Sequence, residues 1–219
     1  MKADLRVYVL LDPAVAGGRT LPELAKLIAP HVTLVQLRDK HGGTRAMVEE
    51  ARAIKAALQG SAVPLLINDR VDVALAAGAD GVHIGQTDMT PADARRLLGP
   101  DAIIGLSCKS VAHAQAAPLD LIDYVAIGAV YATGSKDDAS TPMGPAGLKT
   151  VVDAVRARKA GYPVCAIAGI NASNAADVIA AGADGVSVIS AVSLAPDPAA
   201  AARDLRAVVD AALAKRGRA

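Results

Sequence analysis

The 219-residue sequence contains no phenylalanine and no tryptophan, and it has only four tyrosines. Hydrophobic residues still make up 53% of the chain, so a large core can form, and it has to be built mainly from aliphatic side chains. The two cysteines, Cys108 and Cys165, lack metal-binding or redox spacing and are typical of small buried side chains in a reducing compartment. The length fits one large domain.

An excess of one charge sign is also missing, because 23 basic and 22 acidic residues are mixed along the chain and give a net charge of +1. Without a basic tract, or basic residues interleaved with aromatic ones, we expect no nucleic-acid partner. No apolar run is long enough to cross a bilayer, and residues 1–12 carry charges where a signal peptide needs its apolar stretch. We therefore expect a cytoplasmic protein with no membrane partner.

Short apolar segments recur along the whole chain and alternate with Ala- and Leu-rich stretches of helical spacing. The near-continuous hydrophobicity of these segments is typical of parallel strands that are covered on both faces. Eight such alternations predict an α/β protein, a single-domain (β/α)8 TIM barrel over residues 1–219. An open doubly wound sheet is disfavoured because no GxGxxG follows the first segment. The segments are RVYVLLD (6–12), VTLVQLR (32–38), VPLLIND (63–69), GVHIG (81–85), AIIGLS (102–107), YVAIGAV (124–130), PVCAIAGI (163–170) and GVSVIS (185–190).

The heptapeptide AAGADGV occurs twice, at 76–82 and 180–186. In each copy the first glycine, Gly78 or Gly182, is expected to end a helix in the left-handed conformation, and "GV" is expected to begin the next strand. The copies precede the fourth and eighth segments, so they are half a barrel apart. They share a scaffold and differ in the residues that come directly after it.

In such barrels the chemistry lies at the carboxyl ends of the strands. Alternation directs Gln36 and Arg38 into the barrel mouth, where an amide and a cation suit an anionic or heterocyclic ligand. For Arg38 the alternative is a pair with a neighbouring carboxylate, and Lys40 alone could be a solvated loop residue.

Asp69 and Asp88 follow neighbouring strands, so both carboxylates could reach one Mg²⁺ ion. The alternative for Asp69, or for Asn68 beside it, is to cap the following helix. Asp88 is not needed as a helix cap, because Thr90-Pro91-Ala92-Asp93 already has the pattern of a helix start.

The second half offers small residues where the first offers carboxylates. Gly169 and Ser190 lie at the ends of the seventh and eighth predicted strands. Loops at these ends, near a helix start, commonly bind phosphate, although Gly169 could also serve only a turn. Residues 131–144 lack apolar periodicity, which is typical of a lid or of a solvated mobile loop. Within them, two hydroxyls and an ammonium could close on phosphates: Thr133, Ser135 and Lys136.

His83 should point inward from the fourth strand, where we expect a hydrogen-bonded structural histidine rather than a catalyst. The remaining histidines belong to no recognisable constellation: His31, His41 and His113.

Taken together, these residues resemble the thiamine phosphate synthase family over essentially the whole chain. INDR followed by VHIGQTD at this spacing is specific, whereas the glycine-containing strands alone are not. The segments that carry the resemblance are VQLRDK (35–40), INDRVDVALAAGADGVHIGQTD (67–88), IGLS (104–107), DYVAIGAVYATGSK (123–136), PVCAIAGI (163–170) and GADGVSVIS (182–190).

The resemblance implies a transferase that joins a hydroxymethylpyrimidine diphosphate to a hydroxyethylthiazole phosphate and releases pyrophosphate. It implies that Asp69 and Asp88 hold Mg²⁺ as the cofactor. It places the following residues around the pyrimidine and its diphosphate: Gln36, Arg38, Lys40, Asn68, Ser107 and Lys136. Of these, Lys136, Ser107 and Arg38 are the expected catalytic residues. The thiazole phosphate would be received by Thr133, Ser135, Gly169, Ile189 and Ser190.

The sequence departs from the family pattern at Ala129, Tyr131, Ser135 and Ala168, which bears on loop rigidity and on thiazole-phosphate affinity. Two other functions are compatible with parts of the pattern: a related thiazole tautomerase, which has no diphosphate or metal to handle, and a non-catalytic ligand-binding barrel. Retention of Asp69, Asp88 and Lys136 together favours the synthase. The expected partners are the two small-molecule substrates, and a homodimer is compatible with the resemblance.

Overall fold

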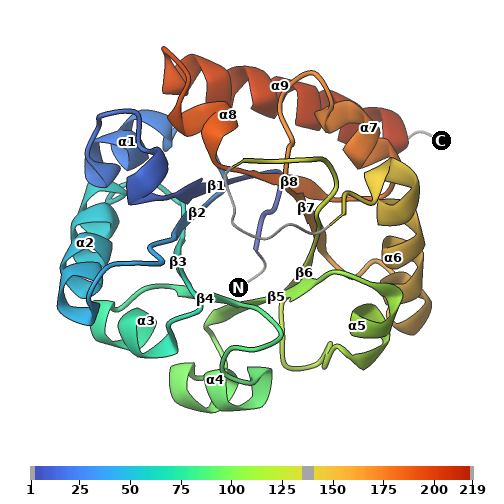
Figure 1. Cartoon of the computed structure of the whole chain (residues 1–219), viewed down its shortest axis with the longest axis horizontal. Helices are drawn as coiled ribbons and strands as arrows, with labels where there is room; N and C mark the ends of the chain where they lie inside the picture. The colour runs from blue at the N-terminus through green and yellow to red at the C-terminus, as the bar shows by residue number, and fades with distance from the viewer. Residues whose placement is uncertain (1–2, 135–140, 218–219) are drawn as a thin grey trace.

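A computed structural model describes residues 3–134 and 141–217 of the chain. Eight parallel strands close into a barrel in sequence order, and helices surround it (Figure 1). The strands are β1 (Val7–Leu11), β2 (Leu34–Leu37), β3 (Leu65–Asn68), β4 (Gly81–Ile84), β5 (Ile103–Cys108), β6 (Tyr124–Ile127), β7 (Val164–Ile167) and β8 (Gly185–Val188). Each lies almost entirely within a segment that the sequence predicts as a strand, so the (β/α)8 prediction is confirmed.

Helices cover the outer face of the barrel, and the short η1 (Pro13–Val15) follows β1. The α-helices are α1 (Leu21–Ile28), α2 (Thr44–Ala57), α3 (Val71–Ala77), α4 (Pro91–Leu98), α5 (Val111–Ala116), α6 (Gly144–Arg158), α7 (Ala175–Ala180), α8 (Ser190–Ser193) and α9 (Pro198–Arg216). Among the described residues, no helix has both the length and the apolar character that crossing a membrane requires.

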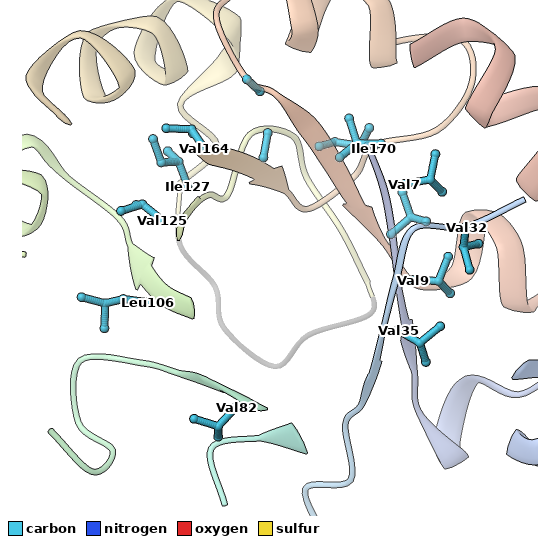
Figure 2. Packing of buried hydrophobic residues seen from close by; sticks show 14 of the residues in the cluster. Val7, Val9, Val32, Val35, Val82, Leu106, Val125, Ile127, Val164 and Ile170 are labelled. Atoms are coloured by element: carbon cyan, nitrogen blue, oxygen red, sulfur yellow. The ribbon is translucent and has the colours of Figure 1, made fainter. Parts of the chain in front are cut away.

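The alternation of side chains along each strand divides the buried residues into two cores. Val9, Val35 and Val82 belong to the larger core between strands and helices, and Figure 2 shows members of this core around the barrel. Leu34 and Leu66 belong to the smaller core inside the barrel. Alternation therefore also directs the polar residues of the same strands inward, towards the barrel mouth.

The repeated AAGADGV has a physical explanation in the close approach of neighbouring strands. A Cβ atom added to Gly81 would lie 1.9 Å from the Ile103 carbonyl oxygen, and one added to Gly185 would lie 1.6 Å from that of Leu5. Only glycine fits at these two strand starts. Gly78 has the expected left-handed conformation at the end of α3, with φ 67°, and Gly182 has φ 114° two residues after α7 ends.

The aspartates of the two copies hold the first amide of the preceding strand. Asp80 accepts a hydrogen bond from Leu65 N at 2.8 Å, and Asp184 accepts one from Val164 N at 2.9 Å. A similar contact recurs outside the heptapeptide: Asp123 accepts from the amide of Ile104, the second residue of β5, at 2.8 Å, and Thr33 Oγ1 accepts from Val7 N at 3.0 Å. A polar residue that accepts a hydrogen bond from the preceding strand thus comes directly before every even-numbered strand. The heptapeptide occurs twice, but this contact occurs four times around the barrel.

Candidate active site

Two adjoining cavities open at the carboxyl ends of the strands. One has a volume of about 580 Å³ and is bordered by residues of all eight strands and of the segments that follow β2 to β5. The other, of about 370 Å³, lies over β7 and β8 and beside residues 132–134. Ile167 and Ser187 border both cavities, so a ligand in one would lie next to a ligand in the other.

The larger cavity brings together the cationic and amide side chains that follow β2 and β3. Its walls include Gln36, Arg38, Lys40 and Asn68. The Arg38 guanidinium also donates to Asp12, and both side chains are almost fully buried. The predicted pair with a carboxylate is therefore observed, and it engages only part of the five N–H donors of the guanidinium, so it does not prevent Arg38 from binding a ligand.

Asp69 and Asp88 lie side by side in the same cavity. Burial raises the pKa of Asp69, and the hydrogen bond and charge of Asp88 raise it further, whereas the hydrogen bond from Lys40 opposes both effects. Asp69 also has a positive φ of 61°, a conformation that non-glycine residues rarely adopt outside functional sites and turns. The two carboxylates are held together at a cost, which is what a cation-binding site requires before the cation arrives.

Neither Asn68 nor Asp69 caps the helix that follows. The N-cap of α3 is Arg70, and no side chain makes a capping hydrogen bond there. At the start of α4, Thr90 accepts from Asp93 N at 3.2 Å, as its sequence pattern predicts. The Asp88 carboxylate instead accepts from Gly85 N at 2.7 Å, which orients it on the cavity wall.

The donor set fits a hard divalent cation. Among the residues that the structure describes, no three His, Cys, Asp or Glu side chains converge on one point, so a site built wholly from protein ligands is not present there. Mg²⁺ is commonly bound through one or two carboxylates together with waters and substrate phosphates. The pair Asp69 and Asp88 matches that pattern.

Three buried polar atoms of residues that border this cavity have no hydrogen-bond partner within the described part of the chain: Gln36 Oε1, Asn68 Nδ2 and Ser187 Oγ. An unpaired buried polar group costs about 1–3 kcal/mol. All three atoms belong to residues that border one cavity, and a polar ligand that reached them would satisfy them.

His83 is a hydrogen-bonded interior residue, as the sequence predicts. Its Nδ1 lies 2.9 Å from the Tyr124 hydroxyl, and its Nε2 lies 2.9 Å from Ser107 Oγ. Ser107 and His83 both border the larger cavity, so this contact joins the interior core to the ligand-binding wall.

The smaller cavity contains the expected phosphate-binding residues that the structure describes: Thr133, Gly169, Ile189 and Ser190. Gly169 has φ 66°, and a Cβ there would lie 2.5 Å from the Ala132 carbonyl oxygen, so the loop after β6 closes directly onto the loop after β7. Tyr131 N donates to Ala168 O at 3.1 Å in the same contact. Ser135 and Lys136 lie outside the described residues.

Residues of the larger cavity that sequence reasoning missed include four polar ones: Tyr8, Lys109, His113 and Ser187. Two of them carried a usable signal, since Tyr8 and Ser187 alternate with outward-facing valines and must point inward. Lys109 and His113 follow β5, and their amide-to-ring contact of 3.3 Å depends on a local turn that no spacing rule predicted. His113 thus borders the larger cavity, a position that the sequence did not predict.

A closed barrel whose two adjoining cavities both lie at the carboxyl ends of its strands defines a (β/α)8-barrel enzyme. The family model described as thiamine monophosphate synthase matches residues 7–192. The chain therefore belongs to the thiamine monophosphate synthase family, whose members are transferases.

Individual relatives agree along nearly the whole chain. The chain is 50% identical over 216 residues to a thiamine-phosphate synthase from Agrobacterium fabrum, covering 98% of both sequences. It is 47% identical over 210 residues to one from Moorella thermoacetica, covering 95% of this chain and 98% of that protein. A solved thiamine phosphate pyrophosphorylase from Pyrococcus furiosus superposes with a TM-score of 0.82 at 33% identity, covering 96% of this chain and 98% of that one.

Proposed function

We propose that this chain joins a 4-aminopyrimidine diphosphate to a thiazole phosphate, forming thiamine monophosphate and pyrophosphate. The observation that carries the proposal is the pair of cavities that meet at Ile167 and Ser187. A condensation needs two ligands in contact. Holding two reactants in line can lower the activation free energy by roughly 7–11 kcal/mol.

The pyrimidine diphosphate is assigned to the larger cavity because its charges suit a diphosphate and a cation. Arg38 and Lys40 would bind diphosphate oxygens, and Gln36, Asn68 and Ser107 would bind the pyrimidine ring. The unpaired Gln36 Oε1 is an acceptor and the unpaired Asn68 Nδ2 is a donor. An aminopyrimidine offers the complementary groups, an exocyclic N–H and ring nitrogen lone pairs.

Asp69 and Asp88 are the residues that would hold Mg²⁺. When bound, the cation would neutralise charge on the diphosphate leaving group. Lys40 donates to Asp69 and borders the same cavity, so it can keep that carboxylate ionised and stay close to the diphosphate. Lys136, outside the described residues, is proposed to stabilise the departing pyrophosphate.

The thiazole phosphate is assigned to the smaller cavity, which has hydroxyls and a glycine loop but no carboxylate on its walls among the described residues. Thr133, Gly169, Ile189 and Ser190 would bind the phosphate, with Ser135 as a further hydroxyl from outside the described part. Absence of a fixed negative charge favours an anionic ligand there.

The reaction needs no protein nucleophile. The bond between the pyrimidine methylene carbon and the diphosphate oxygen breaks, and its electron pair leaves with pyrophosphate. The electron-rich aminopyrimidine delocalises the resulting positive charge, and the thiazole nitrogen then donates its lone pair to form the new C–N bond. Donors around the leaving group are typically worth about 2.7–4 kcal/mol each in such electrostatic stabilisation.

Pyrophosphate release tests the function directly. Release should require both substrates and Mg²⁺, and Asp69→Asn should lower turnover at least about 100-fold, or about 2.7 kcal/mol. Asp153→Asn is the matched control, since Asp153 is exposed on α6 and pairs only with Lys149 at 2.7 Å in the described structure. Metal-independent release, or equal activity of both variants, would contradict the proposal.

A second experiment tests the division between cavities. In Ser190→Asp the added charge should weaken binding of the thiazole phosphate far more than binding of the pyrimidine diphosphate. Ser61→Asp, at an exposed position away from both cavities, should affect neither ligand. Equal losses for both ligands in Ser190→Asp would refute the assignment.

The proposal treats residues 1–219 as one catalytic domain that works in the cytoplasm with two small-molecule substrates. The span of the family match and the nearly complete coverage of the relatives support a single catalytic domain. Sedimentation of the purified protein tests whether it forms a homodimer.

A further inference from the structure

The cation at the end of β2 is held by a carboxylate at the end of β1. The Asp12 carboxylate accepts a hydrogen bond from the Arg38 guanidinium, and the two side chains are only 7% and 11% exposed. Of this pair, only Arg38 belongs to the described wall of the larger cavity. Within the described part of the chain, Asp12 is the one partner of the guanidinium, so most of its N–H groups remain available to a ligand.

The register of the barrel sets these two residues against each other. Leu10 of β1 and Gln36 of β2 are register partners, and both point to the barrel interior, where Leu10 joins the inner core and Gln36 borders the cavity. The next inward positions on the two strands are Asp12 and Arg38. Arg38 N also donates to Leu11 O at 2.8 Å, which keeps the two chain segments paired up to this point.

Both oxygens of the Asp12 carboxylate are engaged. Oδ1 accepts from Ala14 N at 2.9 Å as the N-cap of η1, and Oδ2 accepts from Arg38. The loop that follows η1 is anchored to the segment after α8, because Arg19 donates to Pro196 O at 3.2 Å. An arginine side chain has many rotamers, and a carboxylate with so little freedom selects among them.

We propose that Asp12 is a positioning residue that acts through Arg38, holding the guanidinium so that its remaining N–H groups meet the diphosphate while the bond to the pyrimidine methylene carbon breaks. The inference rests on the proposed function, because it assumes that the diphosphate occupies the larger cavity. Since Asp12 offsets the charge of Arg38, the help that Arg38 gives to the leaving group depends mainly on the direction of its N–H bonds. A guanidinium binds phosphate oxygens through donors in a fixed planar fork, so that direction matters.

Loss of the Asp12 charge should separate rate from affinity. In Asp12→Asn the side-chain oxygen can still cap η1 through Ala14 N, but the amide nitrogen then faces the guanidinium, and a donor meets donors. The released Arg38 keeps its charge, and a negative charge beside the diphosphate is gone, so stronger attraction offsets poorer orientation in binding. The rate depends more steeply on geometry, because a misplacement of about 1 Å can cost about 100-fold in turnover.

The first experiment observes the guanidinium in the ligand-free protein. Arginine side-chain ¹⁵N spectra show separate signals for the two terminal nitrogens when rotation of the guanidinium is slow, and one averaged signal when it is fast. The Arg38 signals are identified by their absence from Arg38→Lys. We expect separate signals in the parent protein and an averaged signal in Asp12→Asn. An averaged signal in the parent would overturn the proposal whatever the enzyme does.

The second experiment measures turnover per folded protein and, by calorimetry, the affinity for pyrophosphate in the presence of Mg²⁺. Asp12→Asn should lower turnover at least about tenfold and change the pyrophosphate affinity less than about threefold. Asp12→Ser should behave alike, because its hydroxyl can cap η1 but it lacks the second oxygen that holds Arg38. Asp123→Asn is the matched control, since Asp123 forms a partly buried pair with Arg95 at 2.8 Å directly before β6, at the amino ends of the strands. It should keep turnover within about twofold of the parent.

A double-mutant cycle shows whether Asp12 acts through Arg38. Arg38→Lys keeps the positive charge but lacks the planar fork of donors, so there is no fork left for Asp12 to direct. Adding Asp12→Asn to Arg38→Lys should therefore lower turnover by less than about twofold further. A further loss as large as in the parent background would show that Asp12 acts independently of Arg38, and would overturn the proposal.

The outcomes also separate this role from the proposed function. A parent protein that releases no pyrophosphate from the two substrates would contradict the proposed function, while the nitrogen spectra would still decide whether Asp12 holds Arg38. An affinity loss in Asp12→Asn as large as its loss of turnover, or an equal loss of turnover in Asp123→Asn, would overturn the positioning role.

Discussion

Replacing Asp184 by alanine tests how the repeated heptapeptide holds the barrel together. The Asp184 carboxylate accepts from Val164 N at 2.9 Å, from Arg156 at 2.9 and 3.0 Å, and from Arg216 at 2.7 Å. It therefore ties the start of β7 to α6 and to α9. Asp80, its counterpart in the first copy, accepts from Leu65 N at 2.8 Å and pairs with Lys55 at 3.3 Å.

These contacts set the expected magnitude. Loss of Asp184 leaves the buried Val164 amide unpaired, which costs about 2 kcal/mol. Its arginine pairs are about one-third exposed, so each contributes only about 0.5 kcal/mol. Asp184→Ala should thus lower the free energy of unfolding by about 3 kcal/mol, and Asp80→Ala by about 2 kcal/mol.

Urea denaturation followed by circular dichroism measures both variants. Asp184→Asn serves as the control, because the amide oxygen can still accept from Val164 N while the charge is lost, and it should cost only about 1 kcal/mol. An Asp184→Asn protein as unstable as Asp184→Ala would show that the arginine pairs dominate and that the bond to the strand does not. Equal stability of Asp184→Ala and the parent would refute the reasoning altogether.

Three further predictions concern the strained backbone, the carboxylate pair and the cysteines. Ala168 has φ 82°, so Ala168→Gly should be no less stable than the parent and up to about 1 kcal/mol more stable in urea denaturation, because relief of strain offsets the greater freedom of the unfolded chain. A clear loss of stability would show that this backbone is not strained. Lys40→Met removes the contact that lowers the pKa of Asp69, so that pKa should rise further. Because Mg²⁺ needs the ionised carboxylate, Mg²⁺ activation should then fail at a higher pH as the solution is acidified, and an unmoved acid limb of the pH–rate profile would contradict this. Burial raises the pKa of Cys108 to about 11 and raises that of Cys165 further, so neither thiol should react with a disulfide reagent at neutral pH until the protein unfolds. Rapid labelling of the folded protein would contradict their burial.

Several features of the fold and site were readable from the sequence because they depend on neighbours along the chain. Apolar segments predicted the eight strands, and the two-residue period placed Gln36 and Arg38 inside and Val35 outside. The start of α4 was readable at Thr90 for the same reason, since a helix cap involves residues only three positions apart. The family motifs INDR and VHIGQTD then indicated that the ends of the third and fourth strands belong to the active site.

Only the tertiary structure decided which of these side chains meet. Barrel closure and the stagger of the strands bring Ser107, His83, Tyr124 and Tyr8 into one chain of hydrogen bonds, although they come from four different strands. The same closure sets Asp69 against Asp88 and gives Arg38 its partner Asp12. Sequence spacing determines the direction of each side chain along its own strand, whereas distances between strands depend on the register of the whole closed sheet.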